Sequence, residues 1–254
     1  MIDALTAALD WSPAQALLVA VMVFVAYTVV GMTGFGAMLV GGSVIAQQFP
    51  LRFVIPFHSL LDVTTSVFIG RKLLHEGDRH ELRLLVPMML IGMTIGLTLL
   101  IKLPTRTAQL LLGVFVVTYA TLSLAGRMPA VRLPRWTAVP LGIAGGVFSA
   151  LFGTGGPIYV MYLSRRIDDV TVVRSTVAVL ITLAAFVRVA MFAVSGLLSA
   201  PSLWVAVLFG MPFMLAGLFL GRRLHHRLPV ERVRKVIYVL LLASGVGLLV
   251  RALE

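Results

Sequence analysis

Apolar runs, separated by short breaks rich in charge, proline or glycine, follow one another along the whole sequence. They predict ten helical segments, at about 12–31, 35–49, 53–70, 83–101, 106–125, 136–152, 156–164, 172–196, 202–220 and 233–250. A helix needs roughly 20 mostly apolar residues to cross the apolar core of a bilayer. The segments at 35–49 and 156–164 are shorter than this, so we expect them to be half-helices or re-entrant pieces.

Composition points to the same class of protein. Of the 254 residues, 59% are hydrophobic and only 12% are charged, and the mean hydropathy is +1.03. Soluble domains carry about 25% charged residues. We therefore expect an all-α integral membrane protein forming a single transmembrane domain over 1–254. Its first ten residues have no basic stretch, so a cleavable signal peptide is not expected.

The absence of cysteine excludes several chemistries. Disulfides, thiolate metal sites and thiol catalysis all need a residue that the chain lacks. The HExxH metal motif, the phosphate-binding lysine loop and a dinucleotide fingerprint in a βαβ setting are also missing. We expect no metal and no cofactor. Transport against a gradient would then depend on a second gradient or on a partner protein.

The sequence also repeats itself on either side of a midpoint near 126–134. Gly31–Gly36 recurs as Phe152–Pro157, with the two Thr-Gly pairs 121 residues apart. The later matches are Gly92 with Gly217, Gly96 with Gly221 and Pro104 with Pro229, each pair 125 residues apart. We therefore expect two repeats of five segments, at 12–125 and 136–251. Because five is odd, the second repeat would be inverted relative to the first, as in many secondary transporters.

Basic residues gather in four loops, at 71–83, 126–135, 164–174 and 221–235. Lys and Arg are enriched in cytoplasmic loops, so this distribution predicts a multi-pass protein of a bacterial-type inner membrane with both termini outside. The net charge of +11 is then an orientation signal, and nucleic acid is not an expected partner. Binding of anionic lipid head groups at 222–235 is a second interpretation.

Two glycine-rich breaks are the first candidate site. The predicted substrate-binding residues there are Thr33, Gly34, Phe35, Gly36, Thr154, Gly155, Gly156 and Pro157. A break in a membrane helix frees backbone groups, which is tolerated in buried protein or beside a cavity. The helix that follows points its partly positive N-terminus at the break, which favours an anion. The alternative is that glycines allow close helix packing, which we prefer for Gly92, Gly96, Gly217 and Gly221.

Ionisable residues inside predicted membrane helices form the second candidate site. His58 and Asp62 lie one helical turn apart in the third segment, and Arg188 lies deep in the eighth. Arg188 could bind an anionic substrate, with Asp62 or His58 carrying a proton. The alternative is a structural Arg188–Asp62 pair, with His58 merely hydrogen-bonded.

These motifs carry a family resemblance. The stretches GMTGFGAMLVGG at 31–42 and GGVFSALFGTGGP at 145–157 resemble the TauE/SafE group of sulfite exporters and anion permeases, and the likeness extends over essentially the whole chain. The resemblance implies transport of small sulfur-containing anions such as sulfite, sulfoacetate or related organosulfonates across the inner membrane. It places the family's glycine-rich motifs on 33–36 and 154–157.

The leading hypothesis is therefore a membrane transporter, with export the favoured direction and gradient-coupled alternating access as its mechanism. Protons are the candidate coupling ion, and assembly into a homo-oligomer is left open. A passive anion channel is the main alternative, and it could not concentrate solute. An intramembrane enzyme using His58 and Asp62 lacks a recognisable nucleophile, so we expect no enzyme. A non-transporting assembly or chaperone subunit would tolerate changes at both breaks.

Overall fold

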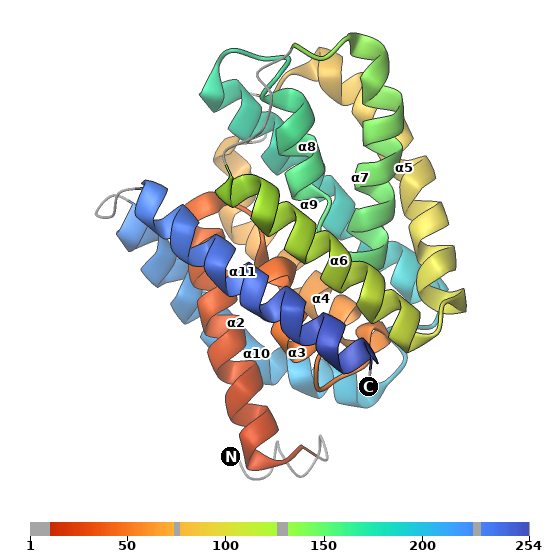
Figure 1. Ribbon diagram of the computed structural model, residues 1–254, viewed down its shortest axis with the longest axis vertical. Coiled ribbons are helices and arrows are strands. Elements are labelled where there is room, and N and C mark those ends of the chain that lie inside the picture. The colour runs from red at the N-terminus through yellow and green to blue at the C-terminus, as the bar shows by residue number, and fades with distance from the viewer. Residues whose placement is uncertain (1–10, 74–76, 126–131, 226–229, 254) are drawn as a thin grey trace. The chain divides into compact units, whose positions relative to one another are not determined.

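The computed structural model describes residues 11–73, 77–125, 132–225 and 230–253, without the side chains of 68–73, 225, 230–237, 240 and 251–253. Throughout these ranges the regular elements are helices (Figure 1). They are α2 (Pro13–Thr33), the π-helix η1 (Met38–Gly42), α3 (Ser43–Ile45), α4 (Leu51–Leu73), α5 (Arg79–Lys102), α6 (Thr105–Leu124), the 3-10 helix η2 (Arg135–Thr137), α7 (Ala138–Phe152), α8 (Gly156–Leu163), α9 (Val170–Val194), α10 (Pro201–His225) and α11 (Val230–Leu253).

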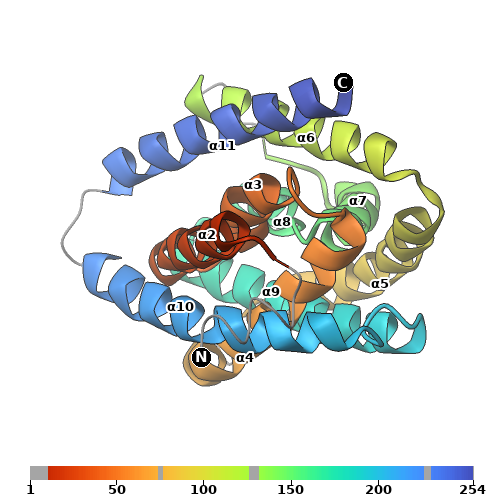
Figure 2. The same ribbon diagram turned by 90° about the horizontal axis from the view of Figure 1, so that it is seen from below.

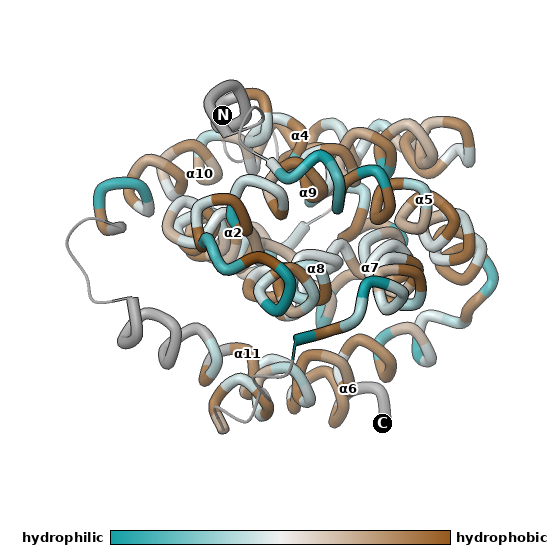
Figure 3. The backbone as a smooth tube through the Cα atoms, turned by 90° about the horizontal axis from the view of Figure 1, so that it is seen from above, coloured by the Kyte–Doolittle hydropathy of each residue, from teal (hydrophilic) through white to brown (hydrophobic). Residues whose placement is uncertain are grey.

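The prediction of an all-α membrane protein is confirmed. Within the described ranges, six helices are long and apolar enough to cross a membrane. They are Pro13–Thr33, Arg79–Lys102, Thr105–Leu124, Arg135–Phe152, Val170–Val194 and Pro201–Leu224. Figure 3 shows hydrophobic residues predominating along α5 and α6. The two expected short segments are also present, as η1 with α3 and as α8.

Some predicted features fall outside this description. Gly126, Arg127, Arg227, Pro229 and the first ten residues are not among the described positions, and neither are the side chains of Arg71, Lys72, Arg232, Arg234 and Lys235.

Local sequence explains where the helices begin and end. Ser12 caps α2 through a capping box with Gln15. Pro13 follows in the first turn, where a backbone N–H would have no acceptor within the helix, so proline is well tolerated. Asp169 caps α9 by accepting from the backbone N–H groups of Thr171 and Val172. These caps fix the starts of two helices at the positions that the polar breaks predict.

The chain forms two compact units, and each is described by itself. Unit 1 contains Met1–Leu61, Leu103–Met128 and Gly196–Glu254, and unit 2 contains Asp62–Lys102 and Pro129–Ser195. In unit 1, α2 packs on α10, and α6 lies beside α11 (Figure 2). In unit 2, α5 packs on α7, and α8 lies against α7 and α9.

Glycines make the closest packing in unit 2 possible. A Cβ atom on Gly92 of α5 would overlap the carbonyl oxygen of Ile143 in α7. One on Gly96 would lie 2.6 Å from the carbonyl oxygen of Val147. Real Cβ atoms do not approach backbone so closely, so these positions need glycine for helix contact. The packing interpretation of both glycines is confirmed.

The matching glycines of unit 1 do the same between α10 and α2. A Cβ atom on Gly217 would overlap the carbonyl oxygen of Phe24, and one on Gly221 would overlap that of Thr28. The packing interpretation is confirmed for these two positions as well.

Each unit thus combines elements of both predicted repeats. The helix α5 belongs to the first repeat and packs on α7 of the second, while α10 of the second packs on α2 of the first. Pro87 inside α5 and Pro212 inside α10 are 125 residues apart, the separation of the matching glycines. The repeats at 12–125 and 136–251 stay a prediction, and so does their inverted orientation.

Candidate functional site

The glycine-rich break in unit 1 ends α2. Gly34 adopts the left-handed conformation, with φ 88°, and Gly36 also has a positive φ of 103°. The hydroxyl oxygen of Thr33 lies 2.8 Å from the carbonyl oxygens of both Val29 and Phe35. The elements after this break are the five-residue η1 and the three-residue α3. The Thr33 hydroxyl is therefore already engaged by the local backbone.

The break in unit 2 is built differently. Gly153 ends α7 in the left-handed conformation, with φ 67°, and its N–H donates to the carbonyl oxygen of Ser149 at 2.9 Å. Pro157 lies in the first turn of α8, as the sequence predicts. Thr154 is 3% exposed, and among the described residues its hydroxyl has no hydrogen-bond partner.

The two breaks correspond in a register other than the one predicted. Their left-handed glycines, Gly34 and Gly153, are 119 residues apart, whereas the Thr-Gly pairs are 121 apart. Thr33 is the last residue of α2, while Thr154 follows the glycine that ends α7. The two threonines are therefore not structurally equivalent. Each motif contains several glycines, so the two sequences can be aligned in either register. The φ angles show that Gly34 corresponds to Gly153.

Arg188 of α9 is buried, with 3% of its surface exposed. Its Nη1 donates to the carbonyl oxygen of Ser149 at 2.7 Å, and its Nη2 donates to Oδ2 of Asp62 at 3.1 Å. Ser149 lies in the last turn of α7, where carbonyl oxygens carry partial negative charge. The guanidinium is thus held between a helix C-terminus and a carboxylate.

The Arg188–Asp62 ion pair was the structural alternative in the sequence analysis, and the structure contains it. The Arg188 side chain is 4% exposed, and that of Asp62 is 19% exposed. The carboxylate is therefore the more accessible partner of the pair. A substrate role for Arg188 stays a prediction that is compatible with this geometry.

His58 lies one turn before Asp62 in α4, but it falls in unit 1. It is buried, and its Nδ1 is 3.1 Å from the carbonyl oxygen of Val54. The hydroxyl of Tyr27 donates to the backbone carbonyl of His58 at 3.3 Å. These contacts are those of a hydrogen-bonded core histidine. Its predicted part in proton coupling stays untested.

Tyr159 of α8 is a buried residue near Arg188 that the sequence analysis did not single out. It is 1% exposed, and in the described part of the chain its hydroxyl has no hydrogen-bond partner. Arg188 acts on it electrostatically. A Cβ atom on Gly145 would overlap the Tyr159 ring, and one on Gly155 would lie 3.1 Å from its Cε2. No feature of the sequence distinguishes this tyrosine from a packing residue.

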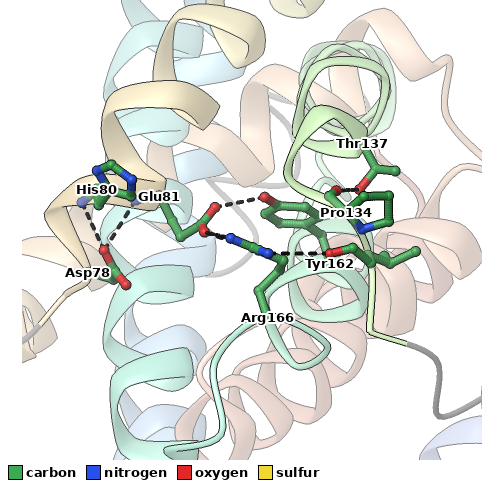
Figure 4. A network of polar contacts seen from close by, with 8 residues as sticks. Asp78, His80, Glu81, Pro134, Thr137, Tyr162 and Arg166 are labelled. Atoms are coloured by element: carbon green, nitrogen blue, oxygen red, sulfur yellow. Dashed lines mark hydrogen bonds and ion pairs between the residues drawn. The ribbon is translucent and has the colours of Figure 1, made fainter.

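A second polar cluster lies at one end of unit 2 (Figure 4). Glu81 is buried and accepts hydrogen bonds from the Tyr162 hydroxyl at 2.7 Å and from Nη2 of Arg166 at 3.0 Å. Nη1 of Arg166 also donates to the carbonyl oxygen of Leu133. The hydrogen bond with Glu81 raises the pKa of the Arg166 guanidinium above its ordinary value. Asp168, two residues after Arg166, forms an exposed ion pair with Arg132.

These contacts bring three of the four basic loops together. Glu81 belongs to the loop predicted at 71–83, Arg132 to that at 126–135, and Arg166 to that at 164–174. Their described parts therefore lie at the same end of unit 2, as a shared cytoplasmic side requires. Which face of the membrane this end occupies stays a prediction.

Comparisons with known proteins agree on one kind of protein. The sequence pattern of the sulfite exporter TauE/SafE family matches residues 18–248. The probable inner membrane transporter protein TsaS of Comamonas testosteroni is 31% identical over 190 residues, which cover 74% of this chain and 80% of the relative. No solved structure matches.

Proposed function

We propose, from the premise that this chain belongs to the sulfite exporter TauE/SafE family of membrane transporters, that it carries a small sulfur oxyanion and that Arg188 binds that anion. Sulfite, sulfoacetate and other organosulfonates are the candidate substrates, and export is the favoured direction. One observation carries the proposal. A guanidinium is buried in a helix long enough to span the membrane, beside the break between α7 and α8.

The chemistry of arginine supports an anion at this point. Its planar fork donates two parallel hydrogen bonds to an oxyanion and keeps its charge at every physiological pH. A charge at the centre of a bilayer costs roughly 2.5–3.5 kcal/mol on insertion scales, so it is rare without a function or a partner. Here the partners of Arg188 include the Asp62 carboxylate, which an anion could replace.

Displacement of the Asp62 carboxylate from Arg188 by the substrate could couple anion transport to protons. With Asp62 ionised, the pair is neutral and a second anion at Arg188 meets a like charge. A proton on the Asp62 carboxylate removes that charge and leaves the guanidinium available to the substrate. Proton binding and anion binding then favour each other, which is the thermodynamic requirement for coupled transport. Asp62 is the more exposed partner of the pair, which supports its assignment as the group that takes up the proton.

The break after α7 is the proposed wall of the site. Its members in unit 2 are the predicted residues Thr154, Gly155, Gly156 and Pro157. Pro157 opens α8, whose N-terminal N–H groups carry partial positive charge. In unit 1, the role of residues 33–36 in substrate binding and that of His58 in proton coupling stay predictions. Alternating access rests on the predicted inverted repeats.

The test is uptake of labelled sulfite, sulfoacetate and sulfate into proteoliposomes, with and without an imposed proton gradient. We expect a sulfur anion to accumulate when the gradient is imposed. Arg188→Gln should reduce this uptake at least a hundredfold, because it removes the charge and one side of the fork. Arg132→Gln is the matched control, since that arginine is exposed and paired with Asp168.

Each other outcome has a distinct meaning. Downhill flux alone would indicate a channel, because a channel cannot concentrate solute. Wild-type transport by folded Arg188→Gln protein would remove Arg188 from the site. Absence of flux for every sulfur anion, from protein that elutes as a folded species, would refute the proposed substrate class.

A further inference from the structure

Two buried hydroxyl groups beside the break between α7 and α8 have no acceptor within the described part of the chain. Tyr159 is 1% exposed and Thr154 is 3% exposed, and no residue in the described ranges accepts from either hydroxyl. Burying a hydroxyl without a partner is costly, so native proteins rarely leave one unexplained. Two of them around one break point to an acceptor that arrives from outside the chain.

The position of the Tyr159 ring depends on two glycines. A side chain at Gly145 would collide with the ring, and a Cβ atom at Gly155 would lie 3.0 Å from the Cβ of Ser149 and 3.1 Å from Cε2 of Tyr159. The ring therefore lies against Gly145 in the middle of α7 and against Gly155 at the start of α8. Ser149 is also the residue whose carbonyl oxygen holds Arg188. Tyr159 and Arg188 thus both lie against α7, about one helical turn apart, at Gly145 and Ser149.

We infer that Tyr159 is a further substrate-binding residue, and that its hydroxyl and that of Thr154, already part of the proposed site, donate hydrogen bonds to the anion held by Arg188. This inference rests on the proposed function. Both groups are neutral donors, so they contribute directed hydrogen bonds without adding charge. Arg188 supplies the attraction, and the two hydroxyls select the arrangement of oxygens.

The number of donors indicates which anions the site prefers. The fork of Arg188 takes two oxygens of an oxyanion. A carboxylate has only two oxygens, both in the plane of the fork, so any further donor has to share them, whereas a sulfonate or sulfite has a third oxygen outside that plane. Buried donors that stay unpaired penalise the analogue that lacks the acceptor. We therefore expect the site to prefer a pyramidal or tetrahedral oxyanion over a planar carboxylate.

Binding and thermal unfolding of the purified full-length protein in detergent test this inference. Sulfoacetate and malonate are the matched probes, because they differ in one sulfonate replacing one carboxylate. Tyr159→Phe keeps the ring and removes the hydroxyl. We expect it to lower sulfoacetate affinity about ten- to hundredfold, the loss of one hydrogen bond to a charged group. Malonate affinity should change less than threefold.

The protein without substrate gives an independent readout. A hydroxyl with no partner contributes nothing to folding, so Tyr159→Phe should leave the unfolding midpoint unchanged or raise it. Tyr162→Phe is the matched control three residues further along α8, where the hydroxyl donates to Glu81. That variant should lower the midpoint and leave the sulfoacetate affinity unchanged. Thr154→Val is the second test variant and carries the same expectation as Tyr159→Phe.

The outcomes separate the inference from the proposed function. Wild-type sulfoacetate affinity in both Tyr159→Phe and Thr154→Val would overturn the inference, and loss of binding in Arg188→Gln would leave the proposed function standing. A lower midpoint with an unchanged affinity in Tyr159→Phe would make Tyr159 a packing residue. Wild-type protein that neither binds nor transports any sulfur anion would refute both.

Discussion

Replacing Asp62 with asparagine tests the coupling mechanism most directly. The change keeps the shape of the side chain and removes the charge that faces Arg188 at 3.1 Å. A hydrogen bond to a charged group contributes about 1.5–3 kcal/mol. Because the Asp62 side chain is 19% exposed, the pair is not fully buried, and we take the lower end. In the Asp62→Asn variant the substrate has no carboxylate to displace. We therefore expect it to bind this variant about tenfold more tightly than the wild-type protein at neutral pH.

The pH dependence of binding should change with the affinity. In the wild-type protein, the anion binds together with a proton on Asp62, so its affinity should fall as pH rises through the range where Asp62 is ionised. One proton per anion gives a slope of about tenfold per pH unit. An asparagine side chain binds no proton, so the Asp62→Asn variant should have a flat profile. Binding of sulfoacetate measured by calorimetry at a series of pH values gives both slopes.

Transport by the same variant gives the second readout. We expect Asp62→Asn to keep downhill flux in proteoliposomes and to lose accumulation driven by a proton gradient. Asp168→Asn is the control, because that carboxylate is 86% exposed and pairs with Arg132. Gradient-driven accumulation at the wild-type level by Asp62→Asn would refute the mechanism. Weaker binding at every pH would show that Asp62 only supports the position of Arg188.

The remaining predictions concern stability. Gly92→Ala places a methyl group against the α7 backbone, so it should lower the free energy of unfolding by about 1–3 kcal/mol, whereas Ile95→Ala on the exposed side of α5 should change the unfolding midpoint little. Glu81→Gln leaves Arg166 without its carboxylate; because the Arg166 side chain is 28% exposed, we expect a loss of about 1–3 kcal/mol, below that of a fully buried pair. Arg132→Ala should change stability by less than about 0.5 kcal/mol, since both partners are exposed. Thermal unfolding in one detergent measures all four, and equal midpoints for Gly92→Ala and Ile95→Ala would contradict the packing argument.

Most of the fold could be predicted from the sequence because lipid imposes simple rules. Spanning helices need long apolar runs, and their ends coincide with polar or proline-bearing breaks such as Ser12–Pro13. The short segments were recognisable from their length alone. The partner of each helix was not predictable in this way. Glycine faces on α5 and α10 do not specify a partner, and only the three-dimensional packing shows that α5 lies against α7 and α10 against α2.

The candidate site was predictable in part. A buried arginine in lipid needs an anionic partner, and Asp62 was a candidate from its position in the third segment. Tyr159 was missed because the absence of a hydrogen-bond partner is a property of the folded surroundings, not of the residue type. The register of the two breaks was also predicted differently. A left-handed glycine is defined by its φ angle, and letters cannot show which of several neighbouring glycines adopts it.

The packing of early helices on late ones, α2 on α10 and α5 on α7, has a consequence for biogenesis. Insertion into the membrane proceeds from the N-terminus, so α2 and α5 enter the bilayer long before α10 and α7 are synthesised. Their glycine-lined surfaces contact lipid until the later helices are synthesised. Neither unit can be completed by the first half of the chain alone. A chain that stops near the midpoint would insert and yet lack the partners for its closest helix contacts. Two halves made as separate polypeptides would have to meet in equal numbers before either could mature.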